Sequence, residues 1–217
     1  MRKKTGRSIS KVVSFVLQPL LMPLYSVALL FVYTNFYDLY TGQMSRFLIP
    51  VSTFSFLLPA LFLLFLWRLK YINSLDSIKQ EERFFPYLIF ITSNLSLLYF
   101  FYTAGVYYWF LGLLAASAVI ALVAFIINFS WKISAHMLGI GGLVGGVISV
   151  CFNVNQSNPW VLFAILFFIA GCLGVSRICA GKSTPAQVYV GFILGFVLSF
   201  ASVFVGTFSI TLMNFNK

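Results

Sequence analysis

Charged side chains are scarce in this 217-residue chain, and acidic ones are the scarcest. Only 8% of the residues are charged, whereas a soluble domain carries roughly 25%, so the composition excludes a soluble globular protein. Four acidic residues and a single histidine argue against a metal centre. The three cysteines form no CxxC or Cys/His cluster, which indicates neither zinc nor disulfides. No GxGxxG motif follows a predicted strand and no P-loop occurs, so we expect no cofactor.

Apolar sequence is what the chain has in abundance: 61% of the residues are hydrophobic and the mean hydropathy is +0.99. A helix needs about 20 residues to cross a bilayer, and seven apolar stretches approach this length. They run over residues 12–34, 48–67, 86–104, 106–129, 137–154, 158–175 and 187–212. Only Ala104 and Gly105 separate the third stretch from the fourth, and the fifth is short, so six or eight spans also fit. We predict an all-α integral membrane protein, a polytopic bundle of about six or seven transmembrane helices in one domain over 1–217.

The net charge of +10 lies almost entirely on one side of this predicted bundle. With seven spans, the N-terminus shares a side with the loops at 68–85, 130–136 and 176–186, and this side carries twelve of the fourteen lysines and arginines. Positive charge in short loops marks the cytoplasmic side, so we expect these segments in the cytoplasm, below a bacterial inner membrane. A basic face attracts anionic lipid head groups. Membrane lipids, anionic or phosphorylated, are therefore the expected partners, and nucleic acid is not.

Glycines recur four residues apart in two of the apolar stretches, as Gly141 with Gly145 and Gly191 with Gly195. Such faces allow helix backbones to approach closely in lipid, where packing rather than hydrophobicity drives association. We expect these glycines to pack helices of one chain against each other. A dimer interface is the alternative, and the sequence leaves the oligomeric state open.

Polar side chains recur in each of the three loops on the basic side. In chain order they are Lys79 and Arg83, then Lys132, Ser134 and His136, then Ser176, Arg177, Lys182 and Ser183. Arginine and lysine hold phosphate oxygens, and a histidine donates a proton near neutral pH. Taken singly, a loop cation more often sets the topology or reaches to lipid head groups than forms a specific site. Their occurrence on one face predicts an oxyanion site.

The first two of these loops resemble signatures of the type 2 phosphatidic acid phosphatase family, which is built from membrane helices. The first family signature runs lysine, six residues, arginine-proline, and Lys79, Arg83 and Pro86 are similar to it with shorter spacing. The second family signature is Pro-Ser-Gly-His, of which this chain has Ser134 and His136. The resemblance implies a helical membrane fold in which these loops meet.

The third loop carries the most persuasive part of the resemblance, which covers roughly residues 75–195. The third family signature is Ser-Arg, five residues, His, three residues, Asp. Ser176 and Arg177 match it, whereas Ser183 and Gln187 stand where the family has histidine and aspartate. In that family the histidine attacks phosphorus and the aspartate orients it. Phosphate binding is therefore easier to support for this chain than phosphate chemistry.

The resemblance implies a role for each matching position. The expected phosphate-binding residues are Lys79, Arg83, Ser134, Arg177 and Lys182. His136 would protonate the leaving alcohol, and Ser183 would be the nucleophile. A serine hydroxyl needs a nearby base, and His136 is the only histidine in the chain. The implied function is that of a divergent phosphatase-like protein that binds a lipid phosphate or diphosphate and, if active, hydrolyses it.

Two other classes of function stay open. In the first, catalysis has lapsed and the protein is a lipid-binding or scaffolding membrane protein whose cationic loops bind head groups. The second is a small transporter, against which stand the lack of a clear inverted repeat and the few charged residues within the spans. Gln18 and Asn94 are the main polar residues within spans, and a hydrogen bond between helices accounts for either. Phospholipids, isoprenoid diphosphates and lipid A phosphates all stay possible as ligands.

Overall fold

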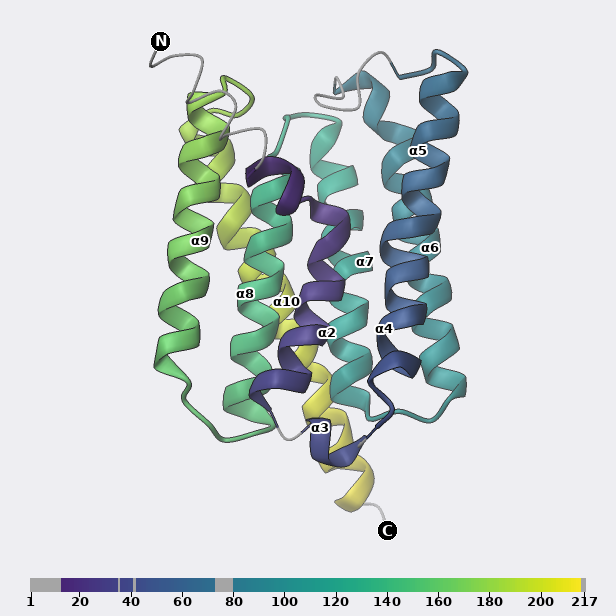
Figure 1. Ribbon diagram of the computed structural model, residues 1–217, viewed down its shortest axis with the longest axis vertical. Coiled ribbons are helices and arrows are strands. Elements are labelled where there is room, and N and C mark those ends of the chain that lie inside the picture. The colour runs from purple at the N-terminus through teal and green to yellow at the C-terminus, as the bar shows by residue number, and fades with distance from the viewer. Residues whose placement is uncertain (1–12, 35, 41, 73–79, 216–217) are drawn as a thin grey trace.

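Long helices run side by side through the whole molecule in the computed structural model (Figure 1). The structure describes residues 13–34, 36–40, 42–72 and 80–215, which form helices and connecting turns and no strand. The helices in chain order are η1 (Pro19–Leu21), α2 (Met22–Tyr33), α3 (Phe36–Leu39), α4 (Met44–Ser52), η2 (Thr53–Leu57), α5 (Leu58–Arg68), η3 (Glu81–Arg83), α6 (Phe84–Thr103), α7 (Tyr108–Asn128), α8 (Ala135–Asn153), α9 (Trp160–Cys179) and α10 (Pro185–Phe215).

Six helices of the described residues are long and apolar enough to cross a membrane. One of them is the continuous helix of α4, η2 and α5 over Met44–Arg68, and the others are α6 to α10. A further apolar helix, Pro19–Tyr33, is shorter. The predicted polytopic helical bundle is confirmed. The third and fourth apolar stretches are separate helices because the chain reverses at Gly105, whose φ of +69° suits a residue without a side chain.

The first apolar stretch, predicted as one segment over 12–34, is broken near its start. Residues 13–16 form a helical turn, Gln18 has extended dihedrals (φ −70°, ψ 139°), and η1 begins at Pro19. The ring of a proline disfavours helical dihedrals in the residue before it, and its missing N–H cannot continue the helical hydrogen bonds. The turn at 13–16 is therefore separate from α2.

Helix α8 forms the centre of the bundle. Within its most apolar window 78% of the residues are buried, against 22% to 44% for the other five spans. A Cβ atom added at Gly141 or Gly145 would overlap main-chain oxygens of α10, and one added at Gly195 would overlap the main chain of α8. The predicted close approach through glycine is confirmed, and it joins two helices of the same chain.

The loops that hold the predicted site all lie at one end of the bundle, the upper end in Figure 1. Helix α5 ends there and α6 begins there, and the same end holds the connections from α7 to α8 and from α9 to α10. The turn at 13–16 precedes α2 at this end as well. The alternating direction of the helices thus brings together loops that are far apart in the sequence.

Candidate functional site

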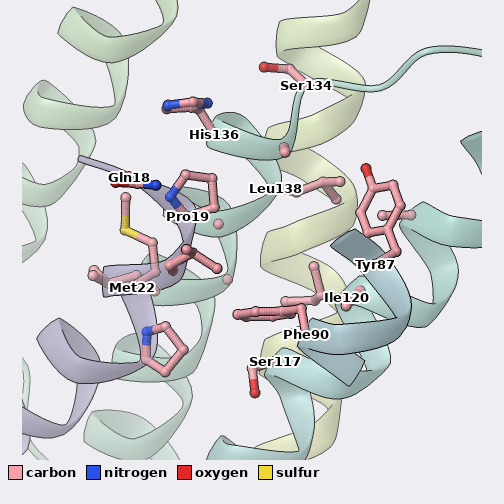
Figure 2. Close-up of a pocket in the computed structure, with 18 of the residues that line it drawn as sticks. Gln18, Pro19, Met22, Tyr87, Phe90, Ser117, Ile120, Ser134, His136 and Leu138 are labelled. Carbon is pink, nitrogen blue, oxygen red and sulfur yellow. The ribbon is translucent and has the colours of Figure 1, made fainter. Parts of the chain in front are cut away.

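A cavity of about 240 Å³ extends from these loops into the bundle between α2, α6, α7 and α8. Figure 2 shows its wall, from Ser134 and His136 at the start of α8 down to Ser117 of α7. The residues at the loop end of the cavity are Arg83, Lys132, Ser134, His136, Arg177, Lys182 and Ser183. The deeper lining includes Met22, Tyr87, Phe90, Ser117, Ile120, Leu138 and Leu143.

This cavity brings together nearly all of the residues predicted from the sequence. Those that line it are Arg83, Ser134, His136, Arg177, Lys182 and Ser183. The remaining one, Lys79, lies outside the described residues. The lining residues come from the start of α6, the start of α8, the end of α9 and the loop before α10. These residues are brought together by the packing of the helices and not by proximity in the sequence.

Four cationic side chains line the mouth of the cavity: Arg83, Lys132, Arg177 and Lys182. None of the described residues that line the cavity is acidic. Burial and the positive charges of Arg83 and Arg177 lower the pKa of the Lys132 amino group. The mouth is therefore a region of positive potential, in which a bound anion would reduce the repulsion between the cations.

Arg177 is the most buried of these cations, with only 7% of its surface exposed. It lies in the last turn of α9, where the helix dipole favours a positive charge. Its Nη1 atom donates a hydrogen bond to Oγ of Ser14 (3.4 Å). Arg83, in contrast, donates from Nη1 to the main-chain oxygen of Ile133 (3.1 Å), which attaches the start of α6 to the segment before α8. Both guanidinium groups are thereby held at the cavity mouth.

The two predicted catalytic residues have different hydrogen-bond partners. His136 donates from Nε2 to the main-chain oxygen of Ser14 (3.2 Å), which requires the proton on Nε2. Ser183 donates from Oγ to Oγ of Ser134 (3.3 Å). Among the hydrogen bonds of the described chain, none joins His136 to Ser183. This arrangement does not provide the base that a serine nucleophile needs.

Gln187, which stands where the third phosphatase signature described above would have aspartate, caps a helix. The main-chain N–H of Thr184 donates to Oε1 of Gln187 (3.0 Å), and the main-chain N–H of Gln187 donates to Oγ1 of Thr184 (3.4 Å). This reciprocal pair is a capping box, and it starts α10 at Pro185, where a missing N–H costs nothing. The cap fixes the position of Ser183, one residue earlier, without orienting its hydroxyl.

Ser14 is a site residue that the sequence prediction did not include, whereas Lys132 was named among the polar loop residues without a role of its own. Lys132 precedes Ser134 by two positions, and this adjacency to a predicted phosphate ligand is the signal that points to it. Ser14 gives no such signal, because its partners His136 and Arg177 lie 122 and 163 positions away. Only the packing of the turn at 13–16 against α8 and α9 brings Ser14 into the site.

Below the cations the cavity is lined mainly by apolar side chains. They include Met22, Phe90, Ile120, Leu138 and Leu143. Two glycines of α8 shape this part: a Cβ added at Gly139 would lie 3.0 Å from Cγ of Met22, and one at Gly142 would lie 2.7 Å from Cδ1 of Ile120. The polar group of Ser117 is satisfied by Oδ1 of Asn94 (2.7 Å), a hydrogen bond between α7 and α6. The cavity is therefore amphipathic, cationic at the mouth and apolar in its depth.

Fold and cavity together define a class of protein, a polytopic α-helical membrane protein with a cation-lined, amphipathic cavity. Comparison of the chain with protein-family models, with curated proteins and with solved structures found no match. In the described part of the chain, no three His, Cys, Asp or Glu side chains come together as ligands for a metal ion. What the site can bind therefore follows from the chemistry of the cavity itself.

Proposed function

We propose that this membrane protein binds a lipid phosphate or diphosphate through the amphipathic cavity. Arg83, Lys132, Arg177 and Lys182 hold the phosphate at the mouth, and the hydrocarbon chain lies in the apolar depth. The observation that carries this proposal is the joining of four cations to an apolar interior in one cavity. A soluble anion would use only the mouth, and an uncharged lipid only the depth.

Several features of the mouth favour a phosphate over a weaker anion. Arginine presents a planar fork of donors that matches phosphate oxygens, and lysine adds a compact charge. The Tyr87 hydroxyl is buried in the cavity wall, where it interacts with the guanidinium group of Arg83. A tyrosine hydroxyl beside an arginine adds a neutral donor with which a phosphate oxygen can also pair. The resemblance to phosphatase signatures supports the same ligand class.

The depth of the cavity favours a ligand with a hydrocarbon chain. Burial of apolar surface contributes about 25 cal/mol per Å², and here the side chains of Phe90, Ile120 and Leu143 are placed to cover such a chain. Gly139 and Gly142 allow Met22 and Ile120, which line the cavity, to pack directly against α8. An alkyl or prenyl chain thus adds affinity that the head group alone does not supply.

We also propose that the cavity mouth faces the cytoplasm. The upper end in Figure 1 holds the loops and helix ends that carry six of the seven lysines and arginines among the described residues. Positive charge in short loops marks the cytoplasmic side. In this orientation the bound head group belongs to the cytoplasmic leaflet.

Hydrolysis of the bound ligand is a second candidate function, favoured by the presence of His136 and Ser183 in the same cavity. The hydrogen bond from Ser183 to Ser134 (3.3 Å) weighs against it, because neither hydroxyl is a base at neutral pH. Binding is therefore the primary proposal. Hydrolysis requires His136 to leave Ser14 and approach Ser183.

Binding is tested with dodecyl phosphate, titrated calorimetrically into the purified protein in a maltoside detergent. We expect dodecyl phosphate to bind, and inorganic phosphate and dodecanol to bind at least tenfold more weakly, because each lacks one end of the ligand. Arg177→Gln and Lys182→Gln should each weaken binding by about tenfold or more. Arg177 is buried, and its variant could fail to fold. Lys182 is partly exposed, so Lys182→Gln tests the site independently of that outcome.

The matched control is Arg46→Gln, which removes a cation at the opposite end of the bundle in α4. It should bind dodecyl phosphate like the wild type. Equal losses in Arg46→Gln and Lys182→Gln would show that general charge attracts the ligand and would contradict the proposed site.

Hydrolysis is tested by phosphate release from phosphatidate and from an isoprenyl diphosphate. Release by the wild type that His136→Ala abolishes would establish an enzyme with an altered nucleophile. If the wild type releases no phosphate but the Ser183→His variant does, the site keeps the geometry for hydrolysis and lacks only the nucleophile. Silence of all variants, with binding intact, would leave lipid-phosphate binding as the function.

A further inference from the structure

The helical turn at residues 13–16 is joined to the site by hydrogen bonds of Ser14. The main-chain oxygen of Ser14 accepts a hydrogen bond from Nε2 of His136 (3.2 Å), and its Oγ accepts one from Nη1 of Arg177 (3.4 Å). Gln18 and Pro19, which follow this turn, lie close to His136 at the upper end of the cavity in Figure 2. One residue thus offers two oxygen atoms to two donors of the site.

These two oxygens resemble part of a phosphate group in what they offer. His136 and Arg177 are donors, and both atoms of Ser14 act as acceptors. In the proposed complex a phosphate oxygen accepts from Arg177 in the same way, and His136, which lines the same cavity, can donate to a second one. A charged oxyanion is the stronger acceptor, because charge-assisted hydrogen bonds are roughly twice as strong as neutral ones. We infer that Ser14 is an internal substitute for the ligand, and that residues 13–17 form a cap which the lipid phosphate displaces. This inference rests on the proposed function.

The cap is held to the bundle by a second, separate contact. The hydroxyl of Tyr25 in α2 donates to the main-chain oxygen of Val16 (2.9 Å). Val13 and Leu17 pack against the apolar cluster around α8 and α9, whereas Phe15 is 77% exposed. Tyr25 does not line the cavity, so its hydroxyl can be removed without changing the site itself.

The backbone allows this cap to move as a unit. One hydrogen bond, from the Leu17 N–H to the Val13 oxygen (2.9 Å), closes its helical turn. The extended Gln18 and the following Pro19 interrupt the helix between the cap and α2. The proposed movement places its dihedral changes at this break, so that Ser14 leaves His136 and Arg177 while α2 stays helical. In the capped state the apparent Kd equals the intrinsic Kd divided by the uncapped fraction.

The test compares dodecyl phosphate binding by the full-length wild type and by Tyr25→Phe. Loss of the Tyr25 hydrogen bond weakens the cap, so the apparent Kd should fall by roughly three- to tenfold, the effect of one hydrogen bond. Ser14→Ala removes the contact to Arg177 and should shift the Kd in the same direction. Tyr33→Phe is the control, because it removes a hydroxyl from the far end of the same helix, and its Kd should equal that of the wild type.

Tighter binding by both cap variants would support the cap. Unchanged or weaker binding by Tyr25→Phe and Ser14→Ala, with intact binding by the wild type, would overturn it and show instead that Ser14 positions its two partners. Hydrogen exchange at the Leu17 amide separates the two proposals. If the Leu17 amide exchanges faster in Tyr25→Phe than in Tyr33→Phe, but dodecyl phosphate binds to none of the proteins, the proposed function is rejected and the mobile segment is retained. Equal exchange in both variants would reject the mobile segment.

Discussion

The lowered pKa of Lys132 shows how its surroundings in the site affect a single residue. Burial and the charges of Arg83 and Arg177 lower the pKa of its amino group. Because the unfolded chain holds this proton more tightly, the protonated lysine lowers the free energy of unfolding at every pH below its folded pKa. The free energy of unfolding then rises with pH between the folded pKa and the higher unfolded value. The folded protein thus tolerates this charge at a cost that a bound anion would offset.

We predict that anion binding raises the pKa of Lys132 and is therefore coupled to proton uptake. Above the lowered pKa the ligand must bind together with a proton, so affinity for dodecyl phosphate should fall as pH rises, by up to about tenfold per pH unit. Titrations should start above pH 7.5, where the phosphate is already a dianion because its second pKa is about 6. Lys132→Arg should bind with a flatter pH profile, because arginine stays charged. The same slope in wild type and Lys132→Arg would contradict this role.

At this scale the sequence predicted much of the cavity mouth and little of its hydrogen bonding. Arg83 and Arg177 could be found because a resemblance to phosphatase signatures marks them. The partners of His136 and Ser183 could not, because each is chosen by side-chain directions within the bundle. Ser14 was beyond reach for the same reason, since it meets the site only through tertiary packing.

At the scale of helices, the long apolar stretches of the sequence were sufficient to locate the membrane spans. A span needs about 20 apolar residues, and turn residues separate one span from the next. The exception is the first stretch, where Pro19 breaks the helix and leaves the turn at 13–16 beside the site. Prolines at 19 and 23 were visible in the sequence, but whether a proline bends a helix or ends it depends on the neighbours that satisfy its backbone. The broken end also lies where the proposed cap must move.

The α8–α10 contact gives a prediction at the same scale. A Cβ atom at Gly195 would overlap the main chain of α8, including the nitrogen of Gly142 at 2.9 Å. Gly195→Ala should therefore force these helices apart and lower the free energy of unfolding by about 1–3 kcal/mol. Thermal unfolding in detergent measures this change.

Gly171→Ala in α9 is the matched control, because nothing lies within 4 Å of a Cβ at that position. Alanine is favoured over glycine in a helix by about 1 kcal/mol, so this variant should be as stable as the wild type or more so. If Gly195→Ala unfolds at the temperature of Gly171→Ala, the close contact of α8 with α10 does not limit stability.

At the scale of the whole molecule, one end of the bundle unites the cavity mouth and most of the basic loops. The basic residues at this end can set the topology or bind a ligand, and the positions of Arg83, Lys132, Arg177 and Lys182 help to separate these two explanations. Topogenic cations need only lie near the membrane surface, whereas these four converge on one cavity. The N-terminal cations Arg2, Lys3, Lys4, Arg7 and Lys11 lie outside the described residues, and their cluster before the first apolar stretch is a topogenic signal in the sequence alone. They are the better indicator of orientation, and they favour a cytoplasmic cavity mouth.

This orientation predicts which side of the membrane reaches Cys179, an exposed residue at the end of α9. In intact cells a membrane-impermeant maleimide should not label it, whereas in inverted membrane vesicles it should. The control places a cysteine at the opposite end by Asn158→Cys in a Cys172→Ala, Cys179→Ala chain, where buried Cys151 is retained. Labelling should then occur in intact cells. The reverse pattern would place the cavity mouth outside the cytoplasm, and its ligand would then be a lipid phosphate of the outer leaflet, because the head group must enter from the side on which the four cations lie.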